Sequence, residues 1–219
     1  MRHPCSAVLV LMIIALLFAR GTWAAGNDPE TVAARKNEVS VSLSSLFGLG
    51  KQEIALAAGY GFGLPVGGSK GTESEDVQYA YLAPRWGIGI SNPLGGNAWY
   101  RGNFELLVEG SFFFNHEPKS GTAAGGAALF RYNFLSGDTF IPFLEAGAGI
   151  ISLDFDLDNQ ADGLNFTTQG GLGFHYFFSE RTALTGEWRF LHISNASINS
   201  PNAGINTSLF LVGVSYFFN

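Results

Sequence analysis

The chain has 219 residues, with 12 Lys and Arg against 18 Asp and Glu, and this net charge of −6 argues against nucleic acid as a partner. Its 29 glycines and 14% aromatic residues, against only 14% charged residues, are unusual for a water-soluble domain. The single cysteine is Cys5, so the chain beyond it has neither disulfides nor thiol chemistry.

The first 24 residues are predicted to be a secretory signal peptide. Arg2 precedes an apolar run from about Ala7 to Phe18, and small residues lead to a predicted cut after Ala24. No later segment offers the roughly 18 uninterrupted apolar residues of a transmembrane helix. Export without disulfides suits a bacterial envelope protein. Residues 25–51 stay unassigned, because their short alternating stretch either extends the first strand or lies in the periplasm.

Residues 52–219 contain eight segments in which apolar residues keep one parity and polar or small residues keep the other, as expected of strands with two different faces. One face is rich in aromatic residues, whereas the other carries charges in mid-strand. The segments lie near residues 53–62, 77–90, 103–114, 128–134, 144–150, 165–178, 181–194 and 210–219, and the charged residues are Arg85, Glu105, Glu109, Arg131, Glu145, Glu187 and Arg189.

This pattern predicts an all-β fold, an eight-stranded antiparallel transmembrane outer-membrane β-barrel with apolar residues facing lipid, rather than a soluble sandwich. A barrel of eight strands has an interior that side chains fill, so its Arg and Glu residues can pair there and no pore remains. Function is therefore expected on the outer wall or in the loops. With both termini in the periplasm, the connections near 63–76, 115–124, 154–163 and 195–205 face outward.

His192 and Ser194 continue the parity of the lipid-facing residues in the seventh segment. Residues i and i+2 of a strand share one face, so both side chains are predicted to point outward from the barrel. The pair lies about 25 Å above the periplasmic turn, near the outer membrane boundary. Histidine beside serine suits nucleophilic catalysis, but on this spacing alone the preferred interpretation is two solvated side chains at the membrane interface, because the spacing is not a specific motif.

The sequence that follows the pair is more specific. His192-Ile-Ser-Asn-Ala, followed by Pro201-Asn-Ala-Gly204, resembles the signature of the lipid A 3-O-deacylases, the outer-membrane acyloxyacyl hydrolase family. The likeness extends over the chain from about residue 50. It implies an eight-stranded barrel with a serine triad on its exterior wall, with Ser194 as nucleophile and His192 as general base. It also implies that Asn195 supports activity at the oxyanion. In the mechanism expected from these roles, donors from Asn195 and from the backbone around Asn202 to Gly204 hold the oxyanion.

The third triad member departs from the family pattern, because Asn206 stands where the family has a glutamate. Its parity places it on the lipid-facing side of the strand next to His192. An amide can accept a hydrogen bond from imidazole and hold its tautomer, but it cannot stabilise imidazolium by charge, and in a serine protease the acid-to-amide change costs about 10⁴ in rate. We therefore expect Asn206→Glu to raise a slow rate. The alternative is a catalytically weak or inactive structural or adhesive barrel.

The expected partners are lipid A of lipopolysaccharide as substrate and the lipids of the outer membrane, with no metal or other cofactor. Asp154, Asp156, Asp158 and Asp162 have calcium-like spacing, but the glycine that turns a calcium loop is missing, so a solvated acidic loop is the preferred interpretation. The oligomeric state, including a homodimer, stays open.

Overall fold

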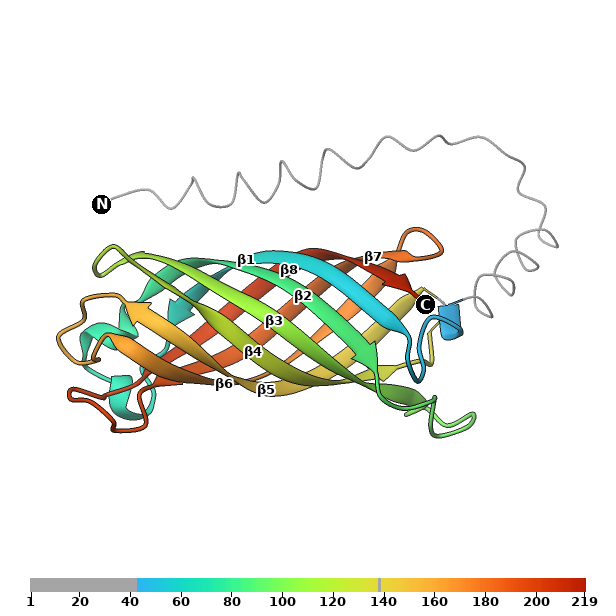
Figure 1. The fold of residues 1–219 in the computed structure, drawn as a ribbon, viewed down its shortest axis with the longest axis horizontal. Helices are drawn as coiled ribbons and strands as arrows, with labels where there is room; N and C mark the ends of the chain where they lie inside the picture. Colours follow the sequence, from blue (N-terminus) through green and yellow to red (C-terminus); the bar gives the residue numbers. More distant parts are fainter. Residues whose placement is uncertain (1–42, 138) are drawn as a thin grey trace. The chain divides into compact units, whose positions relative to one another are not determined.

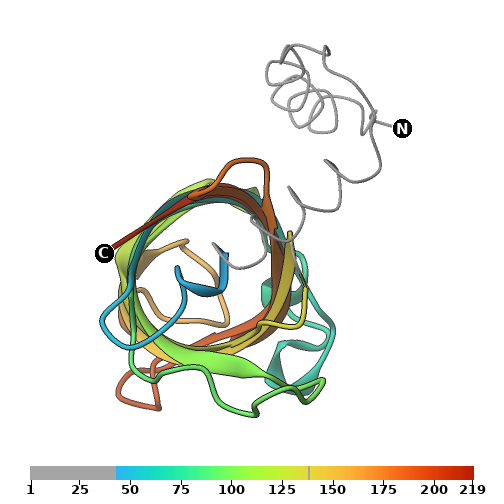
Figure 2. The ribbon, with the colours of Figure 1, turned by 90° about the vertical axis from the view of Figure 1, so that its right-hand side faces the viewer.

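The computed structural model describes residues 43–137 and 139–219. The predicted signal peptide and residues 25–42 lie outside this part of the chain. Eight antiparallel strands form a closed barrel in which each strand pairs with its neighbours in sequence and the last pairs with the first (Figures 1 and 2). The predicted fold class is confirmed. The strands are β1 (Gln52–Gly63), β2 (Gln78–Gly89), β3 (Gly102–Glu117), β4 (Gly121–Phe134), β5 (Phe140–Asp154), β6 (Gly163–Phe177), β7 (Thr182–Ser194) and β8 (Ile205–Phe218).

Side chains of the strands alternate between an exposed apolar outer wall and a buried interior, as the sequence parity predicts. Leu56 is 56% exposed and Val108 54%, whereas Arg131 and Arg189 are fully buried. This arrangement is the inverse of a soluble protein and is that of a barrel surrounded by lipid. Among the described residues, no helix has the length and hydropathy required to cross a bilayer.

The middle of the barrel interior holds a network of ion pairs. Arg85 lies 2.6 Å from Glu109 and 2.7 Å from Glu187, and Arg189 lies 2.9 Å from Glu109. Burying charges is costly unless each is paired, and here each guanidinium meets more than one carboxylate. The predicted pairing of Arg and Glu inside the barrel is confirmed.

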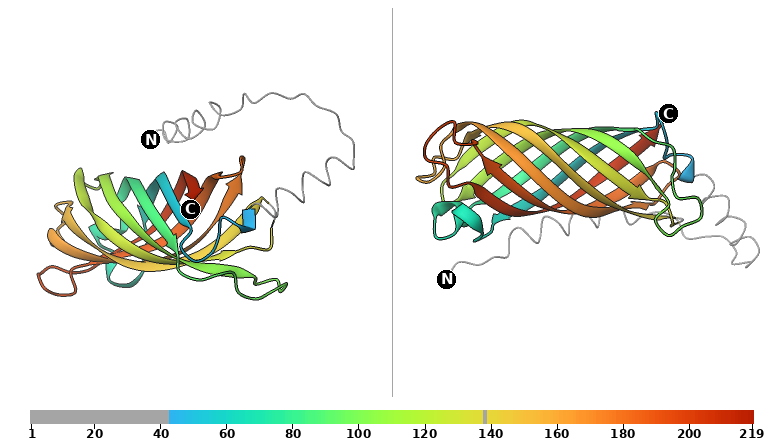
Figure 3. Two further views of the ribbon diagram at one scale, coloured as in Figure 1. Left: turned by 45° about the vertical axis from the view of Figure 1, so that its right-hand side comes forward. Right: turned by 90° about the horizontal axis from the view of Figure 1, so that it is seen from below.

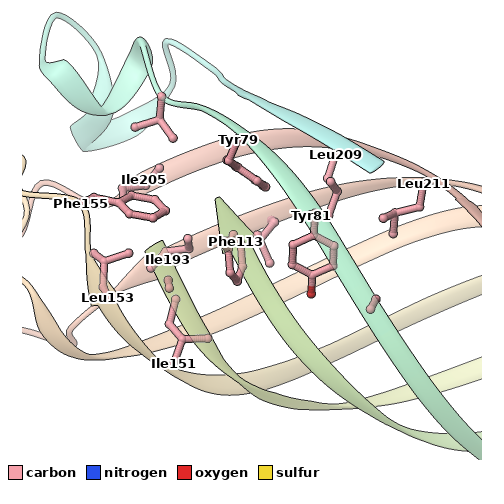
Figure 4. Close-up of a cluster of buried hydrophobic side chains, with 14 of the residues drawn as sticks. Tyr79, Tyr81, Phe113, Ile151, Leu153, Phe155, Ile193, Ile205, Leu209 and Leu211 are labelled. Carbon is pink, nitrogen blue, oxygen red and sulfur yellow. The ribbon is translucent and has the colours of Figure 1, made fainter. Parts of the chain in front are cut away.

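Two apolar clusters lie on either side of these charges. One includes Phe47 and Phe217, whose rings are 5.1 Å apart, and it brings part of the unassigned segment 25–51 onto the end of the barrel that holds the carboxyl terminus (Figure 2). The other includes Tyr79, Phe113 and Ile193, which project from different strands toward one another (Figure 4). This second cluster packs the inside of the wall behind His192.

Three long connections gather at the end of the barrel away from the carboxyl terminus (Figures 1 and 3). The β1–β2 loop, residues 64–77, contains two short 3-10 helices, η1 (Gly67–Ser69) and η2 (Glu73–Glu75). The others are the β5–β6 loop, residues 155–162, and the β7–β8 loop, residues 195–204. At Gly68 a Cβ atom would lie 2.3 Å from the carbonyl oxygen of Ala203, so the β1–β2 and β7–β8 loops are in direct backbone contact.

Candidate functional site

His192 and Asn206 face each other across the β7–β8 ladder. They are directly paired in the register of the two strands, and His192 Nδ1 lies 2.8 Å from Asn206 Oδ1. Directly opposed residues have neighbouring side chains on the same face of a sheet, so strand pairing alone brings these two groups together. The structure thus forms the contact that the parity argument predicts.

The β1–β2 loop covers the amide of Asn206. Asn206 Nδ2 donates to the carbonyl oxygen of Val66 at 2.9 Å and to Ser69 Oγ at 3.2 Å. The backbone N–H of Leu64 donates to the Asn206 carbonyl oxygen at 2.7 Å, which extends β1 pairing past the end of the strand. Asn206 is consequently only 7% exposed. It lies on the outer face, as predicted, but a loop rather than lipid contacts it.

These contacts fix the direction of the amide. A backbone carbonyl oxygen can only accept, so the group facing Val66 must be the amide nitrogen, and Oδ1 must face His192. Because Oδ1 also only accepts, the hydrogen of a neutral His192 ring lies on Nδ1. The lone pair is then on Nε2, the nitrogen that a general base uses.

Ser194 lies two residues beyond His192 on the same face of β7 and is half-buried, as His192 is. Across the sheet it pairs with Phe166 of β6. Within the described residues no hydrogen bond joins Ser194 to His192. Catalytic hydrogen bonds are often long in a ligand-free site and tighten when substrate binds, so this geometry is compatible with a nucleophile and base.

The β7–β8 loop that follows Ser194 is held by two buried amides. The Asn195 backbone N–H donates to Asn202 Oδ1 at 3.0 Å, and Asn195 Nδ2 donates to the Pro201 carbonyl oxygen at 3.4 Å. From the β5–β6 loop, Gln160 Nε2 donates to the same Asn202 Oδ1 at 3.2 Å, while Gln160 Oε1 accepts the Gly204 N–H at 2.8 Å. Asn195 is fully buried and Gln160 is 1% exposed.

The donors predicted to hold an oxyanion therefore differ in availability. The N–H groups of Asn195 and Gly204 are engaged within the loops, at 3.0 Å and 2.8 Å. Asn202 Oδ1 faces the Asn195 N–H and Gln160 Nε2, so Nδ2 of the same amide points away from these two donors. Among the described residues, Nδ2 makes one contact, a long hydrogen bond of 3.4 Å to Ser197 Oγ. Of the predicted residues, Asn202 has the most readily available donor.

Gly204 lies next to the imidazole ring of His192. Its φ is +80°, a left-handed conformation that favours glycine, and a Cβ atom there would lie 3.0 Å from Cε1 of His192. The backbone at Gly204 thus lies against the imidazole ring. This residue limits where the ring can sit.

Sequence reasoning missed Ser69, Val66 and Gln160, which lie far from the His-Ser pair in the chain. Ser69 is fully buried and Gln160 nearly so. A buried polar residue in a predicted outer loop has no local signature, because its burial depends on which loop folds against it. The glycine pair Gly67-Gly68 is the one local feature that fits the close packing of this loop.

Acidic residues of the β5–β6 loop form hydrogen bonds and ion pairs with other parts of the protein. Asp162 Oδ1 accepts the backbone N–H of Phe155 at 2.9 Å, and Lys119 Nζ lies 2.8 Å from Asp158. The hydrogen bond to Asp158 raises the pKa of Lys119. Among residues 43–137 and 139–219, no group of three or more His, Cys, Asp or Glu side chains is arranged to hold a metal ion.

Comparison with known proteins places this geometry in a family. The chain is 34% identical over 88 residues to "Lipid A deacylase PagL" of Pseudomonas aeruginosa strain PAO1, a match that covers 38% of this chain and about half, 48%, of that protein. A solved structure, "Crystal structure of the outer membrane enzyme PagL", superposes with a TM-score of 0.51 at 20% identity, over 74% of this chain and 97% of that one, and supports the fold. A family model described as "Lipid A 3-O-deacylase (PagL)" matches residues 67–215, which include the His192–Asn206 pair and the β7–β8 loop. The chain belongs to the lipid A 3-O-deacylase family.

Proposed function

We propose that this protein is an esterase of the bacterial outer membrane that removes the ester-linked 3-O acyl chain from lipid A of lipopolysaccharide. The observation that carries the proposal is the hydrogen-bonded His192–Asn206 pair on the outer wall, with Ser194 two residues along the same strand face. Family membership supplies the substrate class, and the geometry supplies a base beside a nucleophile.

In the proposed reaction, His192 Nε2 takes the proton of the Ser194 hydroxyl. Ser194 Oγ then bonds to the acyl carbon, and the bond from that carbon to the sugar oxygen breaks. The imidazolium gives its proton to the departing sugar oxygen, which leaves as a hydroxyl group. Water, deprotonated by the same nitrogen, cleaves the acyl-enzyme and regenerates serine.

Asn206 holds the ring in the tautomer that this sequence requires, because its Oδ1 accepts from Nδ1. It offers no negative charge to the imidazolium. The rate is therefore expected to depend more on correct ring placement than on charge stabilisation.

The negative charge that develops on the acyl oxygen needs a hydrogen-bond donor that is already in place. We assign that role to Asn202 Nδ2, whose orientation is fixed by the Asn195 N–H and by Gln160. Asn195 and Gly204 support the loop that carries it. Residual mobility of Asn202 is limited because two donors share its Oδ1.

The position of the site explains how a membrane lipid reaches it. His192 and Ser194 lie on the outer wall at the loop-bearing end, above exposed apolar side chains such as Phe210 and Leu172, each 52% exposed. An acyl chain can stay against this apolar wall while its ester is attacked, so the chain need not leave the bilayer.

The test is to refold the mature barrel, incubate it with lipopolysaccharide in mixed micelles, and follow lipid A by mass spectrometry. The esterase is supported if lipid A loses one hydroxyacyl chain and this loss is abolished in Ser194→Ala and His192→Gln. Both variants must still fold, which is checked by the normal shift in gel migration between unheated and heated barrel. Lipid A that is unchanged with wild-type protein supports the structural or adhesive barrel instead.

A further inference from the structure

The β1–β2 loop makes a contact that no strand pairing requires. Ser69 is fully buried in a loop at the surface of the barrel, and its Oγ lies 2.7 Å from the Val66 carbonyl oxygen and 2.9 Å from the Leu64 carbonyl oxygen. Both carbonyls can only accept, so the hydroxyl hydrogen of Ser69 points to one of them. Its lone pairs are then free to accept from Asn206 Nδ2.

This arrangement matters because the side chain in position 206 is an amide. A carboxylate presents an acceptor to His192 whichever of its oxygens faces the ring. An amide has two different ends, and if it turned over, Nδ2 would face Nδ1 of His192 and favour the opposite tautomer, with the hydrogen on Nε2. A base with that tautomer cannot take a proton from serine.

We propose that Ser69 is a positioning residue for the reaction, and that the β1–β2 loop compensates for the missing acid by locking the Asn206 amide in the orientation that keeps His192 Nε2 unprotonated. Ser69 acts in two ways. It accepts from Asn206 Nδ2, and it holds the turn that brings the Val66 carbonyl to the same nitrogen. The Val66 carbonyl can only accept, so a reversed amide would set oxygen against oxygen there. Ser69 could donate to the reversed amide only by giving up its hydrogen bonds to the Leu64 and Val66 carbonyls. This inference rests on the proposed function in which His192 is the base.

The loop also supplies a matched control. Ser74 is a second fully buried serine of the same loop, but its Oγ contacts Asn159 Nδ2 at 2.5 Å and makes no contact with Asn206. Ser74→Ala removes a buried hydroxyl from the loop, as Ser69→Ala does, and leaves the acceptors of Asn206 in place. Ser69→Cys adds a second comparison, because sulfur fills the space of the hydroxyl but is a weak acceptor.

The first readout is the tautomer of His192, measured in barrels labelled with ¹⁵N-histidine by proton–nitrogen correlation spectra, with the His192 signals assigned from their loss in His192→Gln. We expect the Nδ1–H form in wild type, in Ser74→Ala and in Ser194→Ala. We expect a mixture with the Nε2–H form in Ser69→Ala and Ser69→Cys. A wild-type ring with its hydrogen on Nε2, or a Ser69→Ala ring identical to that of wild type, would overturn the proposal.

The second readout is turnover of lipopolysaccharide in mixed micelles. Ser69→Ala and Ser69→Cys are expected to lower kcat about tenfold with little change in KM, since each disturbs the ring and not the lipid-binding wall. Equal losses in Ser69→Ala and Ser74→Ala, or full activity in Ser69→Cys, would show a packing role and overturn it. If Ser194→Ala keeps its activity, the proposed esterase mechanism fails, but the tautomer still decides what Ser69 does.

Discussion

Nδ1 of His192 and Oδ1 of Asn206 lie 2.8 Å apart at directly paired positions of β7 and β8. The contact joins the imidazole ring that we propose as general base to an amide, at the position where the resemblance implies an acid. Strand register places the two side chains side by side on one face of the sheet. The amide is fixed in turn by Val66 and Ser69 of a loop from the other end of the sequence. The surroundings of residue 206 therefore match both ends of an amide, with acceptors for its nitrogen and a donor for its oxygen. This match determines how substitutions at position 206 should change the turnover rate.

Asn206→Asp is expected to lower turnover about tenfold rather than raise it. Its second oxygen would replace Nδ2, 2.9 Å from the Val66 carbonyl oxygen, where two acceptors repel. Asn206→Glu adds a methylene to a side chain that is only 7% exposed and meets the same carbonyl, so the gain expected from the sequence alone should not appear. Initial rates of acyl release decide the matter, with Asn206→Ala, about a hundredfold slower, as the lower reference. A faster Asn206→Asp enzyme would show that the loop does not discriminate amide from acid.

Asn202→Asp tests the oxyanion donor separately from the loop. Aspartate keeps the oxygen that accepts from Asn195 and Gln160 but replaces the Nδ2 donor with a second, negatively charged oxygen. Turnover should fall about 10² to 10³, the usual cost of removing such a donor, while the melting temperature changes little. Wild-type turnover in this variant would assign the oxyanion to another donor.

Gly204→Ala should abolish most activity by moving the His192 ring. The new Cβ would meet Cε1 of the imidazole at 3.0 Å. Gly163→Ala is the control, because its φ of +86° is equally left-handed but no atom lies within 4 Å of its Cβ position. Each substitution should reduce the free energy of unfolding by about 1–2 kcal/mol. Only the first should reduce turnover, and equal losses of turnover would indicate strain alone.

Arg189→Leu should destabilise the barrel strongly. Its guanidinium contacts Glu109 at 2.9 Å, Glu145 at 2.8 Å, and Glu187, all inside the wall. Without it, three buried carboxylates share only Arg85 and Arg131, and this excess of buried negative charge should cost about 3–5 kcal/mol in the free energy of unfolding. Urea unfolding in micelles, followed by heat-modifiable migration, measures it. Lys119→Ala removes the solvent-accessible contacts of Lys119 with Asp158, Glu73 and the Asp156 carbonyl, and should lower that free energy by no more than about 1 kcal/mol.

The sequence by itself determined the barrel, its two faces and the outward direction of His192, Ser194 and Asn206. These follow from the two-residue period of an extended chain, which is a local steric property and can be read from alternating residues. The His-x-Ser spacing and the turn that follows are local in the same sense.

Only the tertiary structure decided what surrounds Asn206 and holds the β7–β8 loop. Ser69 and Gln160 come from loops distant in sequence, and they reach the site because closure of the barrel places β1 beside β8 and brings three loops to one end. No local period encodes such contacts, since they depend on which loops meet after the strands have paired. The sequence therefore gives the identity and strand face of residue 206, whereas only the fold shows the loop that contacts its amide.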